Sequence, residues 1–450
     1  MTGMTLREIL AVTGGSWCGE EALLDRRALN VVTDSRAAGE GSLFIAIRGE
    51  RTDGHRYIPD VLKKGALAVF CEEAAPGEPR LVVKDVMQAL HTLTSWNRQR
   101  LPIPYVAVTG SVGKTTAKEM IFAVLSARHL TFKTPGSLNG QLGIPVAFLS
   151  LSEEHEAAVV EMGISLPGEM ERIARIVRPD MAVFMNITDA HLEALHSREG
   201  ILREKESILS ASPAYAPVVI NGDDEMLCNH DFGRPTVRFG LGKNCDVRAE
   251  GIRANADCTE QYCTVVSGDR SFELTIPAYG NYMVYAALAA VAVGMALGLT
   301  DEEIAAGVAA YETVGHRSRV LKIKDFTLID DCYNANPTAN RAAVSSMLQL
   351  PGRHICVLGD MREMGENSHG FHVEVGHYLA ENGVDMLFTQ GQEAAHFHEG
   401  APNIPGGHFE SKRELAEALK AAIRPGDVVL VKASRGAAFE DVVAAIQSWA

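Results

Sequence analysis

The stretch that decides the fold is Tyr105–Thr116, with the sequence YVAVTGSVGKTT. Its first four residues form a short apolar run typical of a buried strand, and the next eight are rich in glycine and small polar residues. Apolar residues then recur at helical spacing at Met120, Ile121, Val124 and Leu125. The segment therefore predicts a strand, a tight loop and a helix, an arrangement whose backbone N–H groups bind phosphate.

The loop departs from the full pattern G-x-x-x-x-G-K-[ST], because Val108 stands at the first glycine position and Gly110 follows two residues later. In such loops the glycines let the backbone approach a triphosphate, the lysine neutralises charge and the next hydroxyl binds Mg²⁺. We therefore expect nucleotide binding rather than an ordinary turn. The expected contacts come from Gly110, Ser111, Val112, Gly113, Lys114, Thr115 and Thr116.

Further apolar runs follow this segment, each succeeded by a polar or glycine-containing turn and, in most cases, a helical pattern. Their residues do not alternate between apolar and polar, which is typical of parallel strands covered on both faces. The runs indicate an α/β fold with parallel sheets. They cover residues 157–160, 182–185 and 218–220, and after Gly315 residues 326–329, 355–358, 386–389 and 428–431.

Between these two groups of strands the pattern changes. Residues 246–277 alternate and contain the turn Ser267-Gly268-Asp269, which predicts an antiparallel hairpin insertion. An alanine-rich helix is expected over about 281–297. A capping box at residues 300–303 then predicts the start of another helix.

The chain divides into three predicted α/β domains. Two prolines, Pro102 and Pro104, precede the strand at Tyr105 and disfavour helix there. We therefore predict a small N-terminal domain over 1–100, a central P-loop domain with a parallel sheet over 101–313, and a C-terminal Rossmann-like domain over 314–450.

Composition excludes several classes of protein. The chain has 450 residues, 46% of them hydrophobic and 22% charged, which fits a multidomain globular protein rather than a disordered chain or a rod. The formal net charge of −15 disfavours a broad non-specific surface for nucleic acid or anionic membrane. Any phosphate must therefore be bound locally.

The sequence also predicts a cytoplasmic location. The first ten residues include Arg7 and Glu8, so they lack the apolar core of a signal peptide. The longest uncharged apolar run, residues 284–299, is shorter than a membrane span and rich in alanine, which suits a buried helix. The eight cysteines show no C-x-x-C pair and no zinc-ligand spacing, so reduced thiols are expected.

Three polar residues follow the central strands, where open α/β sheets bind their ligands. Glu161 directly follows one apolar run and could reach a Mg²⁺ held by Thr115, although alone it would be read as a solvent-facing acid. His191 could donate to a metal or a phosphate, although a lone histidine is more often a surface or packing residue. Lys205 lies among alternating charges and alone indicates a solvated helix face.

Two other patterns favour no site. The pairs His369-x-x-His372 and His396-x-His398 lack acid or cysteine companions at a spacing known for metals. Ser434 lies between a predicted strand and a predicted helix, and its simplest interpretation is an N-cap.

Together these motifs resemble the Mur ligases, ATP-dependent amide-forming enzymes of peptidoglycan synthesis, in which the shortened glycine loop is typical. The similarity covers nearly the whole chain and includes eight segments. They are residues 33–36 (TDSR), 109–116, 161–163 (EMG), 186–191 (NITDAH), Lys205, 330–337 (DDCYNANP), 358–365 (LGDMREMG) and 431–435 (VKASR).

The resemblance implies a role for individual residues. Thr115 and Glu161 would hold one Mg²⁺, while His191 and Lys205 would flank a second, with Lys205 matching a lysine that family members carbamylate. Lys114, His191 and Lys205 would thus serve catalysis. Substrate contacts are implied for Ser35, Arg36 and Asn139, nucleotide closure for Arg317 and Asp331, and dipeptide contacts for Asn334 and Asn336.

The chain departs from the family pattern at two places. Where members commonly have Gly-x-His-Asn before the alanine-rich helix, this sequence reads Gly280-Asn281-Tyr282-Met283, so the usual adenine-side residues are lost. At the substrate loop Asn139 is followed by Gly140, so only the first of two frequent asparagines is present.

The implied reaction joins D-alanyl-D-alanine to the carboxylate of UDP-N-acetylmuramoyl-tripeptide through an acyl phosphate. The resemblance implies ATP, Mg²⁺ at two sites, a monomeric enzyme, and a part in cell wall biogenesis, cell shape and division. The N-terminal domain would bind the UDP-muramoyl substrate. Alternatives are a muramoyl-dipeptide ligase, a folylpolyglutamate synthase or a nucleotide-dependent switch, and the segment 333–337 (YNANP) argues against the first two.

Overall fold

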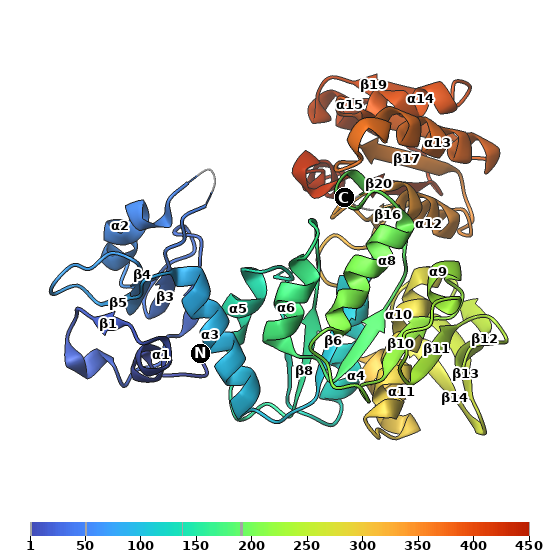
Figure 1. Ribbon diagram of the computed structural model, residues 1–450. Helices are drawn as coiled ribbons and strands as arrows, with labels where there is room; N and C mark the ends of the chain where they lie inside the picture. Colours follow the sequence, from blue (N-terminus) through green and yellow to red (C-terminus); the bar gives the residue numbers. More distant parts are fainter. Residues whose placement is uncertain (1, 50–51, 137, 190–191, 450) are drawn as a thin grey trace.

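The computed structural model describes residues 2–49, 52–136, 138–189 and 192–449. Three sheets follow one another along the chain, and the central one lies between the other two (Figure 1). The prediction of three α/β domains is confirmed.

The N-terminal domain is built on a five-stranded sheet in the order β1-β5-β4-β3-β2. Strands β2 to β5 run parallel, and β1 pairs antiparallel with β5. The strands are β1 (Ser16–Trp17), β2 (Asn30–Val32), β3 (Ser42–Ile45), β4 (Ala68–Cys71) and β5 (Arg80–Val82). The helices are α1 (Leu6–Thr13), α2 (Ile58–Lys63) and α3 (Val86–Arg100), with 3₁₀ turns η1 (Glu21–Leu23) and η2 (Gly54–Tyr57).

The central domain has a nine-stranded sheet in the order β14-β13-β12-β11-β10-β9-β6-β8-β7. Strand β6 lies between β8 and β9, and its register pairs Val108 with Glu161 and Thr109 with Phe184. The phosphate loop therefore begins level with the ends of both neighbours. The first six strands are β6 (Tyr105–Thr109), β7 (Thr131–Lys133), β8 (Ala157–Glu161), β9 (Met181–Phe184), β10 (Val218–Asn221) and β11 (Thr236–Gly240).

The predicted hairpin forms, but it belongs to a longer extension of the same sheet. Strand β12 (Val247–Ala254) pairs parallel with β11, and β13 (Gln261–Ser267) and β14 (Arg270–Ile276) continue antiparallel. The hairpin is thus the edge of the nine-stranded sheet rather than a separate insertion. Every other residue of β13 is buried from Gln261 to Val265, as expected when one face of a strand packs on a core.

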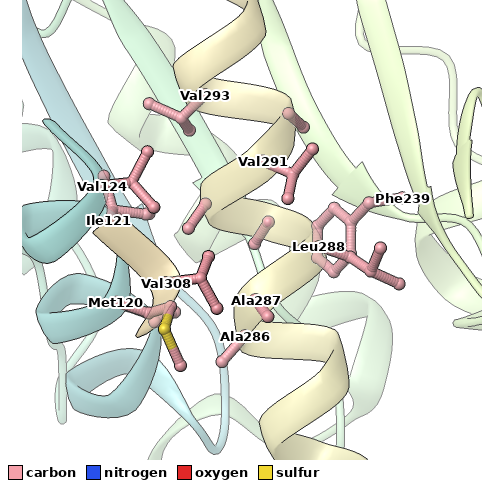
Figure 2. Packing of buried hydrophobic residues seen from close by; sticks show 14 of the residues in the cluster. Met120, Ile121, Val124, Phe239, Ala286, Ala287, Leu288, Val291, Val293 and Val308 are labelled. Atoms are coloured by element: carbon pink, nitrogen blue, oxygen red, sulfur yellow. The ribbon is translucent and has the colours of Figure 1, made fainter. Parts of the chain in front are cut away.

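Helix α10 (Asn281–Ala296) is the alanine-rich helix that the sequence predicts, and it crosses the core of the central domain (Figure 2). Ala286, Ala287 and Leu288 are all buried, because the helix is covered by the sheet on one side and by α4 on another. The other helices of this domain are α4 (Lys114–Ser126), α5 (Gly143–Phe148), α6 (Glu169–Val177), α7 (Leu192–Leu195), α8 (Arg198–Glu206), α9 (Glu225–Cys228) and α11 (Asp301–Ala309), with the turn η3 (Ser207–Leu209).

The C-terminal domain has a six-stranded sheet in the order β15-β16-β20-β17-β18-β19, in which only β15 is antiparallel. Its strands are β15 (Arg319–Ile323), β16 (Phe326–Asp330), β17 (His354–Gly359), β18 (Met386–Gln390), β19 (Gly406–Phe409) and β20 (Val428–Lys432). Its helices are α12 (Pro337–Met347), α13 (Ser368–Glu381), α14 (Phe397–Gly400), α15 (Lys412–Ala422) and α16 (Glu440–Gln447), with turns η4 (Gly365–Asn367), η5 (Ala394–His396) and η6 (Arg435–Ala437).

Two connections join the domains. Helix α3 ends at Arg100 and β6 begins at Tyr105, while α11 ends at Ala309 and β15 begins at Arg319. We propose the domain boundaries 100/101 and 313/314 inside these connections. Among the described residues, no helix is long and apolar enough to cross a membrane.

Candidate active site

The phosphate loop connects β6 to α4, and its two glycines adopt backbone angles that other residues avoid. Gly110 has φ of 152°, and a Cβ atom there would lie 2.9 Å from Cβ of Met185. Gly113 has φ of 78° and immediately precedes α4. The loop thus passes close to the end of β9, and it leads into the N-terminus of α4, where backbone N–H groups can bind a phosphate.

The segment after β9 holds this loop in place. Asn186 accepts a hydrogen bond from Val112 N at its Oδ1 (2.9 Å) and donates from Nδ2 to Val112 O (3.1 Å). Its backbone carbonyl accepts from Ser111 N (3.0 Å), and Ser111 Oγ accepts from Thr188 N (2.9 Å). The loop is therefore preorganised by side chains from a neighbouring strand end, a support that spacing within the loop itself did not indicate.

Two lysines meet at the carbonyl oxygen of Gly110. Lys114 Nζ donates to it over 2.8 Å and to Ser111 O over 3.2 Å, and Lys205 Nζ donates to it over 3.0 Å. Burial lowers the pKa of Lys114, which Glu161 opposes. Burial lowers the pKa of Lys205 well below its ordinary value, and the Lys114 charge lowers it further.

The interpretation of Lys205 as part of a solvated helix face is therefore wrong. It is 1% exposed and points from α8 into the sheet end. Its neighbours in sequence, Glu204 and Glu206, are part-buried at the rim, so the charge pattern concealed an inward-facing amine.

Glu161 ends β8 and is 1% exposed, so its alternative reading as a solvent-facing acid is also wrong. Its Oε1 accepts from Asn139 Nδ2 over 2.8 Å. Its Oε2 is buried and, among the described residues, has no hydrogen-bond partner. Lys118 Nζ lies 3.7 Å from that oxygen. A buried carboxylate oxygen left in this state is available to a cation.

Lys118 is a buried site residue that the sequence reasoning missed. It is 0% exposed and donates to the carbonyls of Thr134 and Gly136, each over 2.8 Å. Its Nζ also lies 3.1 Å from Glu119 Oε1. The available signal was its spacing, since it lies one helical turn after Lys114 on the same face.

The C-terminal domain presents a second group of polar residues. Asp331 accepts from Ser318 N (3.0 Å) and from Lys432 Nζ (2.6 Å), and the guanidinium of Arg317 lies 3.8 Å from the centre of the Tyr333 ring. Arg317 and Glu363 both influence the pKa of Lys114, the former lowering and the latter raising it. This domain therefore faces the phosphate loop.

The two asparagines of the C-terminal motif have local roles. Asn336 Oδ1 accepts from Ala339 N over 2.8 Å, so Asn336 is the N-cap of α12. Asn334 Oδ1 accepts from Ala335 N, and its carbonyl accepts from Lys432 Nζ over 2.9 Å. Lys432 thus joins the Asn334 carbonyl to the carboxylate of Asp331.

Ser434 is not a side-chain N-cap, contrary to its simplest reading. Its Oγ accepts from Arg362 N (2.9 Å) and donates to Ala335 O (3.3 Å), so it joins two loops at the carboxyl ends of interior strands of the C-terminal sheet.

The remaining predicted residues are separate from the loop or lie beyond the described ranges. Ser35 and Arg36 belong to the N-terminal domain, where Arg36 pairs with Asp34 (2.7 Å) and the Ser35 carbonyl accepts from Lys64 Nζ (2.8 Å). His191 lies outside the described residues. The structure therefore brings together Lys114, Glu161, Lys205 and Asn139, and the charge of Arg317 acts on Lys114 from the C-terminal domain.

Near the predicted adenine side, Tyr282 donates to the Tyr279 carbonyl over 2.9 Å, and Gly280 has φ of 108°. A cavity of about 640 Å³ opens beside Tyr279, lined by residues of both the central and C-terminal domains. Tyr282 and the buried Met283 thus occupy the start of α10 in place of the more usual histidine and asparagine.

A phosphate loop at the switch point of a parallel sheet, faced by a second mostly parallel domain, defines a nucleotide-binding α/β protein of three domains. Family models match in the same order. The Mur ligase family, catalytic domain, matches residues 29–102, the Mur ligase middle domain 108–294, and the Mur ligase, glutamate ligase domain, 316–435. The chain belongs to the Mur ligase family.

Its relatives include the UDP-N-acetylmuramoyl-tripeptide--D-alanyl-D-alanine ligase of Bacillus subtilis (strain 168), which is 34% identical over 92% of each chain. A crystal structure of MurF from Acinetobacter baumannii is 31% identical, with a TM-score of 0.87 over 99% of each chain. MurF ligase from Thermotoga maritima in complex with ADP is 30% identical, with a TM-score of 0.82 over 93% of this chain and 97% of that one.

Proposed function

We propose that this chain is an ATP-dependent, ADP-forming ligase that joins D-alanyl-D-alanine to the terminal carboxylate of UDP-N-acetylmuramoyl-tripeptide. The relatives that carry this name cover almost the full chain, and a similar structure was solved with ADP. The single observation that carries the proposal is the convergence of Lys114, Glu161 and Lys205 at the loop from 110 to 116. The enzyme would act in the cytoplasm during cell wall synthesis.

The chemistry requires two anions to approach each other. A carboxylate is a poor acceptor for an amine because oxide cannot leave, so ATP first converts it to an acyl phosphate. The dipeptide amine then attacks, and phosphate leaves with the formation of the amide. Lys114 and the amides of residues 110–116 would bind the phosphates and neutralise charge as the transfer proceeds.

The residues present fit Mg²⁺. Glu161 offers a buried oxygen without a hydrogen-bond partner among the described residues, and Thr115 follows Lys114 at the start of α4. Thr115 and Glu161 would hold one ion, and His191 and Lys205 would flank a second, which Lys205 would ligate only in its carbamylated form. When bound, the ions supply charge compensation between the carboxylate and the γ-phosphate.

Lys205 is suited to carbamylation because its lowered pKa favours the neutral amine that reacts with CO₂. The modified side chain would be an anion in place of a cation, next to Lys114. We expect short carboxylates to restore part of the activity that Lys205→Ala loses. Unchanged turnover in Lys205→Ala would contradict the carbamate.

The other domains supply the substrates. Ser35 and Arg36 would contact the UDP end, and Asn139, which holds Glu161, would lie on the tripeptide side. Arg317 and Asp331 would close on the nucleotide, while Asn334 and Asn336 would contact the dipeptide. Exclusion of water protects the acyl phosphate from hydrolysis.

Phosphate release is the decisive measurement. A ligase should release phosphate only when ATP, UDP-N-acetylmuramoyl-tripeptide and D-alanyl-D-alanine are all present, and Lys114→Ala should abolish this release. A nucleotide-dependent switch would hydrolyse ATP regardless of the other two compounds. Release that ignores either substrate would therefore overturn the proposal.

A further inference from the structure

Three side chains of metal-binding type meet where the central domain connects to the C-terminal domain. His316 precedes β15, and Asp330 and Cys332 lie at the end of β16. Nδ1 of His316 lies 2.7 Å from Oδ2 of Asp330, and Sγ of Cys332 lies 3.3 Å from Oδ1 of the same carboxylate. One ligand atom from each residue lies within 4.8 Å of the others.

The chemistry of this set is specific. Thiolate and imidazole favour Zn²⁺ over the hard cation Mg²⁺, and a carboxylate completes a common type of zinc ligand set. We propose that His316, Asp330 and Cys332 form a binding site for Zn²⁺ or a similar borderline-soft divalent cation. With three protein ligands, the fourth position of a tetrahedral site is left to water.

An ion can reach these residues from solvent. His316 and Asp330 line the cavity of about 640 Å³ between the two domains. The His316 side chain is 44% exposed, whereas the Asp330 side chain is 3% exposed and Cys332 is 1% exposed. The histidine therefore stands at the mouth, with the carboxylate and thiol behind it in a less polar environment that strengthens their attraction for a cation.

Binding exchanges protons for the metal without any change of oxidation state. In the structure the Cys332 thiol donates to Asp330, and burial raises the pKa of that thiol. As the zinc–sulfur bond forms, the thiol proton leaves for solvent and the ion remains divalent. The liberated Asp330 oxygen and the His316 nitrogen complete the protein ligands.

A second group of ligand-type residues provides an internal comparison. His369 and His396 both contact Glu399, at 2.8 and 2.6 Å. This group is more exposed, since the side chain of His369 is 58% exposed, that of His396 30% and that of Glu399 52%. This group joins one member of each histidine pair seen in the sequence, since His372 and His398 bind elsewhere. It has no sulfur, so spectroscopy distinguishes the two groups.

The position of the site indicates a consequence for activity. Its ligands flank Arg317 and Asp331, which follow His316 and Asp330 directly in the chain. A metal that fixes His316 against the end of β16 would restrain both residues. We therefore expect Zn²⁺ to lower ligase turnover at saturating Mg²⁺ and a chelator to restore it, an expectation that rests on the proposed function.

Cobalt titration of the full-length, chelator-treated protein tests the site itself. Co²⁺ bound by a thiolate gives an intense near-ultraviolet charge-transfer band, and we expect one equivalent to produce it and one equivalent of Zn²⁺ to abolish it. Cys332→Ala should lose the band, whereas Cys356→Ala, which removes a buried thiol from β17, should keep it. His316→Ala should keep the band but weaken Co²⁺ binding at least tenfold.

Absence of the band in the wild-type protein, or its survival in Cys332→Ala, would overturn the site. Unchanged Co²⁺ affinity in His316→Ala, which replaces a half-exposed side chain and should fold normally, would overturn the ligand set. None of these measurements requires turnover, so they remain decisive even if the chain proves not to be a ligase. If the band appears but Zn²⁺ does not lower turnover, the metal site is confirmed and its proposed effect on activity is overturned.

Discussion

The amines of Lys114 and Lys205 both donate to the Gly110 carbonyl; Lys205 is buried and Lys114 is part-buried. Two neighbouring ammonium groups in a site of low polarity repel each other, and each loses hydration. The two lysines thus destabilise the folded protein, and an anionic substrate or modification of Lys205 would remove part of this destabilisation. Such an arrangement favours function over stability.

Lys205→Met should abolish turnover and raise the free energy of unfolding at neutral pH, because it removes a buried amine while keeping its volume. The native pKa of Lys205 is lowered from 10.5, so the unfolded chain binds more protons between that lowered value and 10.5. Wild-type stability should therefore rise with pH through this window, and the variant should lose the part due to Lys205. Urea titrations across this range would measure both effects.

Lys118→Met is the matched substitution at the other fully buried lysine of this site, and it should lower the free energy of unfolding instead of raising it. Lys118 lies between the carboxylates of Glu119 and Glu161 and donates to two carbonyls. Its loss leaves buried charge uncompensated, at a cost of about 3 to 5 kcal/mol. The urea midpoint should fall. A fall in both variants would contradict the description of Lys205, and a rise in both would contradict that of Lys118.

The sequence could predict Lys114 because its role follows from a local pattern. Lys118 was missed although its helical spacing from Lys114 was visible, and Lys205 was identified only through family resemblance. Burial of both depends on strand ends that are distant in sequence, such as the carbonyls of Thr134 and Gly110. Local charge pattern carries no signal of that kind.

Helix α11 packs against α4 through Gly307, where a Cβ atom would lie 2.4 Å from Cα of Val124. Alanine normally stabilises a helix interior by about 1 kcal/mol relative to glycine. Here a backbone atom blocks it, so the helices must separate, at an overpacking cost of about 1 to 3 kcal/mol. Gly307→Ala should therefore lower the free energy of unfolding. Gly370→Ala in α13, which meets nothing within 4 Å, is the control and should not lower it.

Asn336 combines a structural role with a proposed substrate role, and substitution can separate them. Asn336→Ala should lose about 1 kcal/mol of stability, because the N-cap of α12 is removed. Asn336→Ser should keep the cap and the unfolding midpoint but raise KM for D-alanyl-D-alanine. If Asn336→Ser has wild-type KM, the asparagine serves only as a cap.

Among the elements, continuous apolar runs located the central strands to within a residue or two. Strand β8 was expected over 157–160 and covers Ala157–Glu161. Short edge strands such as β7 (Thr131–Lys133) and β19 (Gly406–Phe409) carry no such run and were not predicted. Their pairing depends on the rest of the sheet, since three or four residues carry too little pattern alone.

At the scale of the whole molecule, the two outer domains are attached differently. Helix α3 packs on α5 and α6 of the central domain, where Arg98 pairs with Asp180 and Asn97 donates to the Phe148 carbonyl. The C-terminal domain is joined through residues 310–318, and a cavity of about 640 Å³ opens beside this connection. Closure should therefore come mainly from the C-terminal domain.

Arg317 is the residue best placed to couple nucleotide binding to this closure. It lies in the connection itself, stacks on Tyr333, and its charge acts on Lys114. We expect the radius of gyration in X-ray solution scattering to decrease when a non-hydrolysable ATP analogue and UDP-N-acetylmuramoyl-tripeptide are added. Arg317→Ala should bind the analogue through the loop yet fail to compact.

Arg413→Ala removes an exposed guanidinium from α15 of the same domain and should compact like the wild type, since its charge lies 3.7 Å from Glu417 on the helix surface. If Arg317→Ala also compacts fully, closure is driven by the substrates alone. The connection would then act as a passive hinge, because a residue without differential contacts in the open and closed states cannot shift the equilibrium between them.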